Sequence, residues 1–215
     1  MYGLRSEAQI ARSLGRTPQS VKRMVHKVFA GEPRSGPWTA REVAELKRYL
    51  GAADLQVIAR ILRRSEQEVE RRILMLQESV QPRNWTSSDV QRLKRLYGTR
   101  SSGDLSLILA QPVDEIERKA EELCLAKDKG YVRRSGTGAV RMPRWSAKEI
   151  EVLRKLYPDT PNLEIARRVG RSEKSVVSKA HDLGLKKSGD RLRRMGRENV
   201  AVRYGNGEDD EKAAE

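Results

Sequence analysis

The side chains of this chain that could do chemistry are mostly cations. Its 215 residues include 44 Lys and Arg against 30 Asp and Glu, a formal net charge of +14. Three stretches concentrate that charge: residues 17–29 hold three bases and no acid, and residues 126–144 and 186–204 each hold a surplus of five bases. Cations gathered in this way bind polyanions, so the chemistry they favour is the binding of phosphate groups.

Residues for other chemistry are scarce. The two histidines, His26 and His181, and the single cysteine, Cys124, leave little material for a metal centre, a disulfide framework or a nucleophile–base pair. No acidic triad and no phosphate-cradling loop is visible in the sequence. We therefore expect no enzymatic activity and no cofactor. No apolar stretch approaches the ~20 residues of a membrane span, so we expect no membrane partner.

An internal repeat must position the cations. Aligned on Trp38, Trp85 and Trp145, three segments match without a gap for 40 residues, and apolar residues recur 8, 20, 31, 35 and 38 positions after the tryptophan. A fourth copy lies at the N-terminus, where I-A-R-S-L-G-R-T-P-Q-S-V at 10–21 matches I-A-R-R-V-G-R-S-E-K-S-V at 165–176. Its tryptophan would precede Met1, so we expect this copy to lack its first helix: either the start was lost or misassigned, or residues 1–29 pack against something else.

Each complete copy predicts three helices. The first begins with a capping box after the tryptophan, at Thr39/Glu42, Thr86/Asp89 and Ser146/Glu149. A short second helix follows, and then a tight turn and a third helix capped by Ser172 or Thr17, with Pro18 in its first turn and Gly184 as a C-terminal cap. We expect an all-α fold of tandem three-helix (helix-turn-helix, homeodomain-like) repeats, three full and one N-terminally truncated.

The combined pattern resembles a known family. W-(S/T)-x-x-(E/D)-(V/I)-x-x-L followed by I-A-x-x-x-G-R-(S/T)-x-x-S-V is similar to the Myb/SANT-like helix-turn-helix repeat. Aliphatic residues replace the second and third tryptophans typical of Myb repeats, at Ile58, Leu105 and Ile165 and near Leu125 and Leu185, and this version resembles units common in bacterial and phage regulators. The resemblance implies that third helices lie in the major groove of double-stranded DNA.

Charge separates the four third helices. Residues 17–29 are purely basic, residues 172–183 are balanced, and residues 65–76 and 112–123 carry net charges of −1 and −3. Phosphates repel an acidic helix, so we expect the outer copies to bind DNA and the middle copies to space them or to contact a protein partner, as SANT-type repeats do. The alternative interpretation is that these acids only form a solvated face.

The resemblance also places individual contacts. Arg23 and Gln19 suit guanine and adenine edges, and Lys22, Lys27, Arg171, Lys174 and Lys179 suit phosphates. The full set of residues expected to bind DNA is Gln19, Ser20, Lys22, Arg23, Lys27, Arg133, Arg134, Arg171, Lys174, Ser175, Ser178, Lys179, Lys186 and Lys187.

The expected organisation follows from the repeat and the charge. It comprises a truncated unit at 1–30, repeats at 37–78, 84–126 and 145–186, a flexible basic linker at 127–144, a basic tail at 187–204 and an acidic disordered terminus at 205–215. The linker and tail are expected to lie along phosphates or in a minor groove, or else to be solubilising disorder.

These features predict a double-stranded DNA-binding protein, a transcription regulator located on DNA in the cytoplasm or nucleoid of a bacterium or phage host, or in a eukaryotic nucleus. Two alternatives stay open: an architectural or adaptor protein whose acidic middle repeats hold a protein partner, and the DNA-recognition subunit of a recombinase or transposase.

Overall fold

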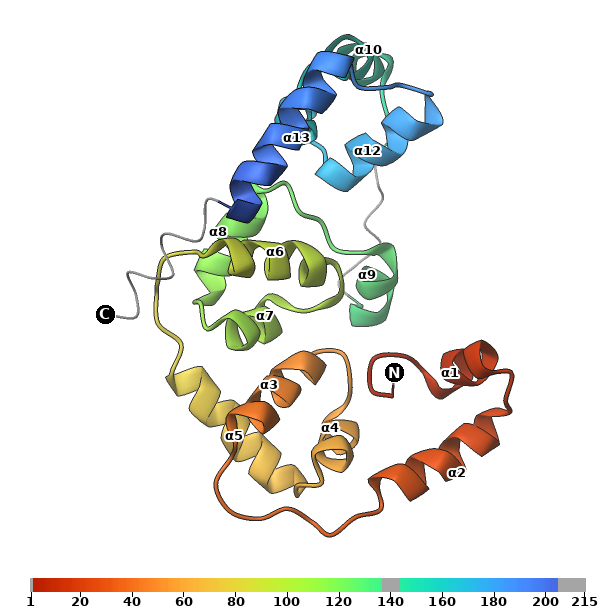
Figure 1. The fold of residues 1–215 in the computed structure, drawn as a ribbon, viewed down its shortest axis with the longest axis vertical. Coiled ribbons are helices and arrows are strands. Elements are labelled where there is room, and N and C mark those ends of the chain that lie inside the picture. Colours follow the sequence, from red (N-terminus) through yellow and green to blue (C-terminus); the bar gives the residue numbers. More distant parts are fainter. Residues whose placement is uncertain (1, 137–143, 205–215) are drawn as a thin grey trace. The chain divides into compact units, whose positions relative to one another are not determined.

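The computed structural model describes residues 2–136 and 144–204, and these residues form thirteen α-helices and no strand. The expectation of an all-α chain is therefore confirmed. The chain divides into two compact units, one of Met1–Glu121 with Ala126–Val140 and one of Glu122–Leu125 with Arg141–Glu215 (Figure 1). No helix in the described ranges is long and apolar enough to cross a membrane.

The N-terminal segment consists of two helices, α1 (Glu7–Leu14) and α2 (Pro18–Phe29). Thr17 caps α2 by accepting a hydrogen bond from the backbone N–H of Ser20, and Pro18 stands in the first turn, where no donor is lost. A small core joins the two helices. It is formed by Ile10, Ala11, Val21 and Val25, with Tyr2 and Phe29 packed against it.

Three helices follow each tryptophan. They are α3 (Ala40–Tyr49), α4 (Leu55–Leu62) and α5 (Glu66–Glu78) after Trp38; α6 (Ser87–Leu96), α7 (Ser102–Leu109) and α8 (Val113–Glu122) after Trp85; and α10 (Ala147–Leu156), α11 (Asn162–Val169) and α12 (Glu173–Asp182) after Trp145. The three expected capping boxes are all present, at Thr39, Thr86 and Ser146. Most of the aligned apolar positions are buried: Leu46, Leu93 and Leu153 are fully buried in their segments, whereas Ile73 and Leu183 are half-buried.

The segments of Trp38 and Trp85 pack directly on each other. Helix α7 contacts α3 and α5 of the preceding segment as well as α6 of its own. Its sequence explains this double packing, because Leu105, Ser106, Ile108 and Leu109 are all buried and so occupy more than one face of the helix. These two segments are therefore one body rather than separate modules joined by a spacer.

The turn before each third helix adopts the left-handed conformation. Gly15 and Gly170 stand there with φ of 61° and 62°, whereas Arg63 and Ala110 occupy the corresponding positions with φ of 55° and 50°. Glycine adopts this conformation without steric cost, but a Cβ makes it unfavourable by roughly 1–2 kcal/mol. The two outer turns are thus relaxed and the two middle turns are strained.

The basic linker and tail, expected as a flexible linker and a basic tail, contain helices. Helix α9 (Lys129–Ser135) lies in the linker, and α13 (Gly189–Tyr204) makes up most of the tail. The expected linker residues 137–143 and the acidic terminus 205–215 lie outside the described residues.

Equivalent contacts fix the starts of α9 and α13. The Nζ of Lys127 lies 3.7 Å from the ring centroid of Tyr97 and donates a hydrogen bond to the carbonyl of Arg100. In the same way, the Nζ of Lys187 lies 3.9 Å from the ring centroid of Tyr157 and donates to the carbonyl of Thr160. The backbone N–H groups of the next residues, Asp128 and Ser188, each donate to a carbonyl in the loop after the first helix at 2.8 Å. The sequence repeat thus extends to a fourth helix in its last two copies.

Candidate nucleic-acid interface

Four helices occupy the same place in the aligned segments: α2, α5, α8 and α12. Each buries one apolar face in its own core, as Val21 and Val25 do in α2 and Val176 and Ala180 do in α12. Residues half a turn away from these positions must face outward. The four outward faces are therefore directly comparable surfaces.

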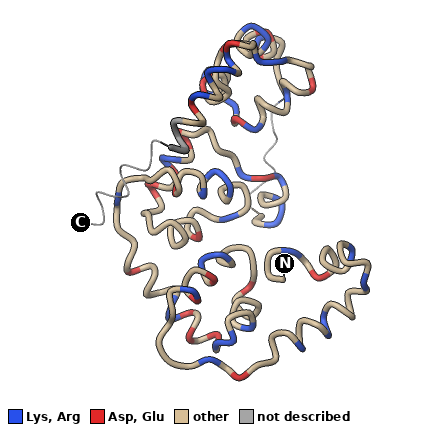
Figure 2. Tube along the Cα trace, viewed as in Figure 1, with Lys and Arg blue, Asp and Glu red and all other residues tan. Residues whose placement is uncertain are grey.

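The outward face of α2 is basic and open. Gln19, Arg23, His26 and Lys27 are all exposed on it, and Figure 2 shows only Lys and Arg among the charged residues of this helix. Lys22, at its edge, has its Nζ 3.7 Å from a carboxylate oxygen of Glu7, yet its side chain stays 64% exposed. An exposed pair of this kind contributes little free energy, so Lys22 can exchange it for a phosphate.

The outward face of α12 is polar with balanced charge. Lys174 and Ser178 are exposed there, as expected, together with His181 and Asp182. Ser175 and Lys179 are less exposed: both side chains are half-buried and lie to the side of this face. The exposed Lys186 follows α12 in the chain, and Arg133 and Arg134 are exposed in the last turn of α9.

Arg171 is bound within its own segment. Its Nε donates to a carboxylate oxygen of Glu149 at 2.8 Å, its guanidinium donates to the backbone carbonyl of Arg144, and the guanidinium carbon lies 5.3 Å from the ring centroid of Trp145. Hydrogen bonds from Arg171 and then from Ser146 lower the pKa of Glu149 to about 2. Arg171 therefore joins the start of α10 to the turn before α12, and we leave it out of the candidate interface.

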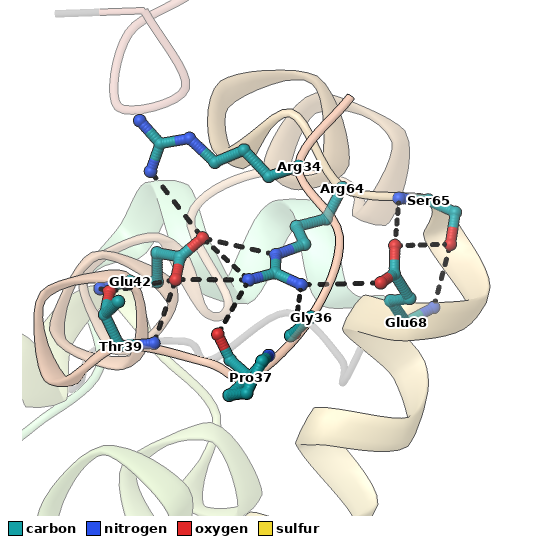
Figure 3. A network of polar contacts seen from close by, with 8 residues as sticks. All are labelled: Arg34, Gly36, Pro37, Thr39, Glu42, Arg64, Ser65 and Glu68. Carbon is teal, nitrogen blue, oxygen red and sulfur yellow. Dashed lines mark hydrogen bonds and ion pairs between the residues drawn. The ribbon is translucent and has the colours of Figure 1, made fainter. Parts of the chain in front are cut away.

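The same arrangement recurs around Arg64, deeper in the protein. Its guanidinium donates to both carboxylate oxygens of Glu42 at 3.1 and 3.2 Å and to the carbonyls of Gly36 and Pro37 (Figure 3). The guanidinium carbon lies 5.0 Å from the ring centroid of Trp38. Burial opposes ionisation of Glu42, but hydrogen bonds from Thr39 and Arg64 outweigh it and lower the pKa to about 2.

The third segment builds this cluster from other residues. Gln111 stands at the aligned position of the arginine and is fully buried; it donates to the carbonyl of Arg83 at 2.7 Å. Arg83, two residues before Trp85, then supplies the guanidinium that donates to Asp89 at 2.8 Å. Reasoning from the sequence missed all three clusters. The available signal was an Arg or Gln 26 residues after each tryptophan, paired with an acid 4 residues after it.

Lys187 is also engaged inside its segment. It is half-buried over Tyr157, and burial, together with the nearby positive charge of Arg191, lowers its pKa to about 8. One of its three N–H donors is already used in a hydrogen bond to the carbonyl of Thr160. Lys187 therefore lies outside the candidate interface, whereas its neighbour Lys186 stays in it.

The outward faces of the middle helices differ sharply from that of α2. On α8 this face carries Asp114, Glu121 and Glu122 with the single base Arg118, which pairs with Glu115. On α5 it carries Gln67 and Arg71 with two exposed apolar side chains, Leu74 and Met75. Neither face gathers cations.

Comparisons with known proteins found no relative of this chain. No family model matches the chain, and no curated protein and no solved structure matches it. Within the described ranges, no group of three or more His, Cys, Asp and Glu side chains is placed to hold a metal ion.

Proposed function

We propose that the chain is a double-stranded DNA-binding protein built from tandem helix-turn-helix repeats similar to Myb/SANT repeats. The contrast between the outward faces carries this proposal: α2 presents Arg23 and Lys27 with no acid, while the corresponding face of α8 presents three acids. A duplex has a high density of negative charge, so only the first kind of face can approach its groove without repulsion.

Roles for the open side chains follow from their chemistry. Arg23 and Gln19 on α2 suit hydrogen bonding to guanine and adenine edges, and Lys22 and Lys27 flank them for phosphates. On the second unit, α12 offers Lys174 and Ser178. The remaining cations of the candidate interface, Arg133, Arg134 and Lys186, are suited to phosphate contacts outside the third helices.

Regulation of transcription is the activity that sequence-selective binding of this kind would serve. Binding-site selection from random duplexes with the full chain tests it, and we expect an enriched motif. Neutralising roughly 6–8 phosphates gives a slope of log K against log salt concentration of about −5 to −7. Failure to enrich any motif would remove sequence-selective regulation from the proposal.

A second function is favoured by the surface of α5. Leu74 and Met75 are 58% and 55% exposed on the outward face of that helix, where a DNA-reading helix needs polar side chains. An adaptor would use this apolar surface and the acidic α8 to hold a protein while the basic helices bind DNA. In that case, binding-site selection enriches no motif although binding remains strong and salt-dependent.

A further inference from the structure

An open apolar groove runs between the two helices of the N-terminal segment. It has a volume of about 720 Å³, and its lining includes Tyr2, Leu14, Arg16, Met24 and Val28. Three of these side chains are large, apolar and more than half exposed: Leu14, Met24 and Val28. Such a surface is unfavourable in water unless something covers it.

The other segments show what covers the equivalent surface. Leu14 aligns with Leu62 and Leu109, and its exposed fraction of 58% compares with 4% and 1% for those residues. Val28, 63% exposed, aligns with Leu76, which is 8% exposed. In each complete segment, the helix that follows the tryptophan contacts the helix that carries the residue aligned with Leu14: α3 contacts α4, α6 contacts α7 and α10 contacts α11. In the last copy, for example, Leu153 of α10 packs with Ile165, Val176 and the half-buried Val169.

Arg16 gives the groove a charge requirement. It aligns with Arg64 and Arg171, and the backbone N–H of all three donates to the carbonyl five residues earlier, at 2.9–3.0 Å, so the turns are alike. Arg64 and Arg171 bind the carboxylates of Glu42 and Glu149 and stack near a tryptophan. The Arg16 side chain is exposed and has no ion pair with any described residue. A carboxylate beside an aromatic ring is the complementary chemistry.

We propose that this groove binds an amphipathic helix of a partner protein whose first turn reads aromatic-(Ser/Thr)-x-x-Glu, the pattern of residues 145–149. The glutamate pairs with Arg16, the aromatic ring lies against the guanidinium, and a leucine eight residues after the aromatic fills the space beside Leu14 and Val28. The chain's own helices of this pattern, α3 and α10, and helix α6, which has Asp89 in place of the glutamate, are each engaged in their segments. A second copy would therefore have to open one of its own cores to supply such a helix.

A peptide of this chain's own sequence tests the proposal. We would titrate residues 144–158, acetylated and amidated, into the full chain and follow the methyl NMR signal of Met24, which lies in the groove. The expected result is a saturable shift of Met24. Arg16→Gln in the protein, or Glu149→Gln in the peptide, should each weaken binding at least tenfold, with little further loss when the two are combined.

Arg12→Gln is the matched control, because Arg12 is exposed on α1 but does not line the groove. It should leave the affinity unchanged. Absence of a Met24 shift at millimolar peptide, or equal loss from Arg12→Gln and Arg16→Gln, would overturn the proposal. A dimer in sedimentation velocity that Arg16→Gln dissociates would overturn it too, by assigning the groove to a second copy. Because no DNA is present, the outcome is independent of the proposed DNA binding.

Discussion

Helices α2 and α8 share a scaffold and differ in what they present to solvent. Their buried positions are alike, with Val21 and Val25 in one and Ile116 and Ala120 in the other. The outward positions pair Gln19 with Asp114, Arg23 with Arg118, His26 with Glu121 and Lys27 with Glu122. The fold therefore constrains one face of each third helix and leaves the other free to change. Function must be inferred from the outward face, because the buried pattern alone makes these segments look equivalent.

The largest effect is expected from substitutions that reverse the charge of α2 and so remove its difference from α8. Changing Lys22, Arg23 and Lys27 together to Glu replaces three phosphate-binding cations with three repelling anions, and we expect a loss of DNA affinity of roughly 1,000-fold near 0.1 M salt. Fluorescence anisotropy with a labelled duplex measures this loss. The companion variant is Glu115→Ala with Glu117→Ala on α8, which should not weaken binding. Equal losses from the two variants would refute the division between outer and middle helices.

The buried clusters give the next effect. Arg64→Met removes the buried cation of Glu42 and leaves this nearly inaccessible carboxylate with only the exposed Arg34, 3.6 Å away, so we expect the free energy of unfolding to fall by about 3 kcal/mol. Arg171→Met should cost less, because the side chain of Glu149 is 23% exposed and water can replace part of the interaction. Urea denaturation followed by circular dichroism measures both. Arg41→Met, at an exposed position of α3, should change stability by no more than about 0.5 kcal/mol.

A pH titration tests the same clusters without removing a side chain. Glu42 and Glu149 have a pKa of about 2 in the folded protein against an ordinary value of 4.5. The unfolded chain therefore binds protons that the folded chain does not, and stability present above pH 4.5 should be lost as the pH falls toward 2. Urea midpoints at pH 5 and pH 3 check this expectation. Glu42→Gln should make the drop smaller, and an unchanged drop would show that Glu42 does not carry the effect.

The smallest expected effect comes from substitutions in the turns that precede the third helices. Ala110→Gly removes the steric cost of a left-handed alanine, and we expect it to stabilise the protein by about 0.5–1 kcal/mol. Gly170→Ala introduces that cost and should destabilise by about 1 kcal/mol. Thermal unfolding of the two single variants provides the measurement. A change of the same sign in both would contradict the assignment of strain to the middle turns.

Local chemistry explains what the sequence could predict. Capping boxes, the proline at the start of α2 and the aligned apolar positions depend on neighbours a few residues away, so the helices and the buried leucines were predictable. The start of α13 depends on Lys187 meeting Tyr157, thirty residues earlier in the chain, whereas the charges of this segment suggested a basic tail along phosphates or in a minor groove, or solubilising disorder.

Arg171 shows the same limit within the candidate interface. By type and position it suits a phosphate, and only its distance to Glu149 and Trp145 shows that it serves the fold. The opposite holds for Arg23 and Lys27: their spacing from Val21 and Val25 was enough to place them on the outward face, where the structure has them exposed.

Lysine acetylation footprinting, read by mass spectrometry with and without the selected duplex, tests the division of labour most directly. We predict that DNA protects Lys22, Lys27 and Lys174 from acetylation while leaving Lys94 on α6 and Lys119 on α8 as reactive as in the free protein. Protection of Lys119 and Lys94 with unchanged reactivity at Lys22 and Lys27 would contradict the account.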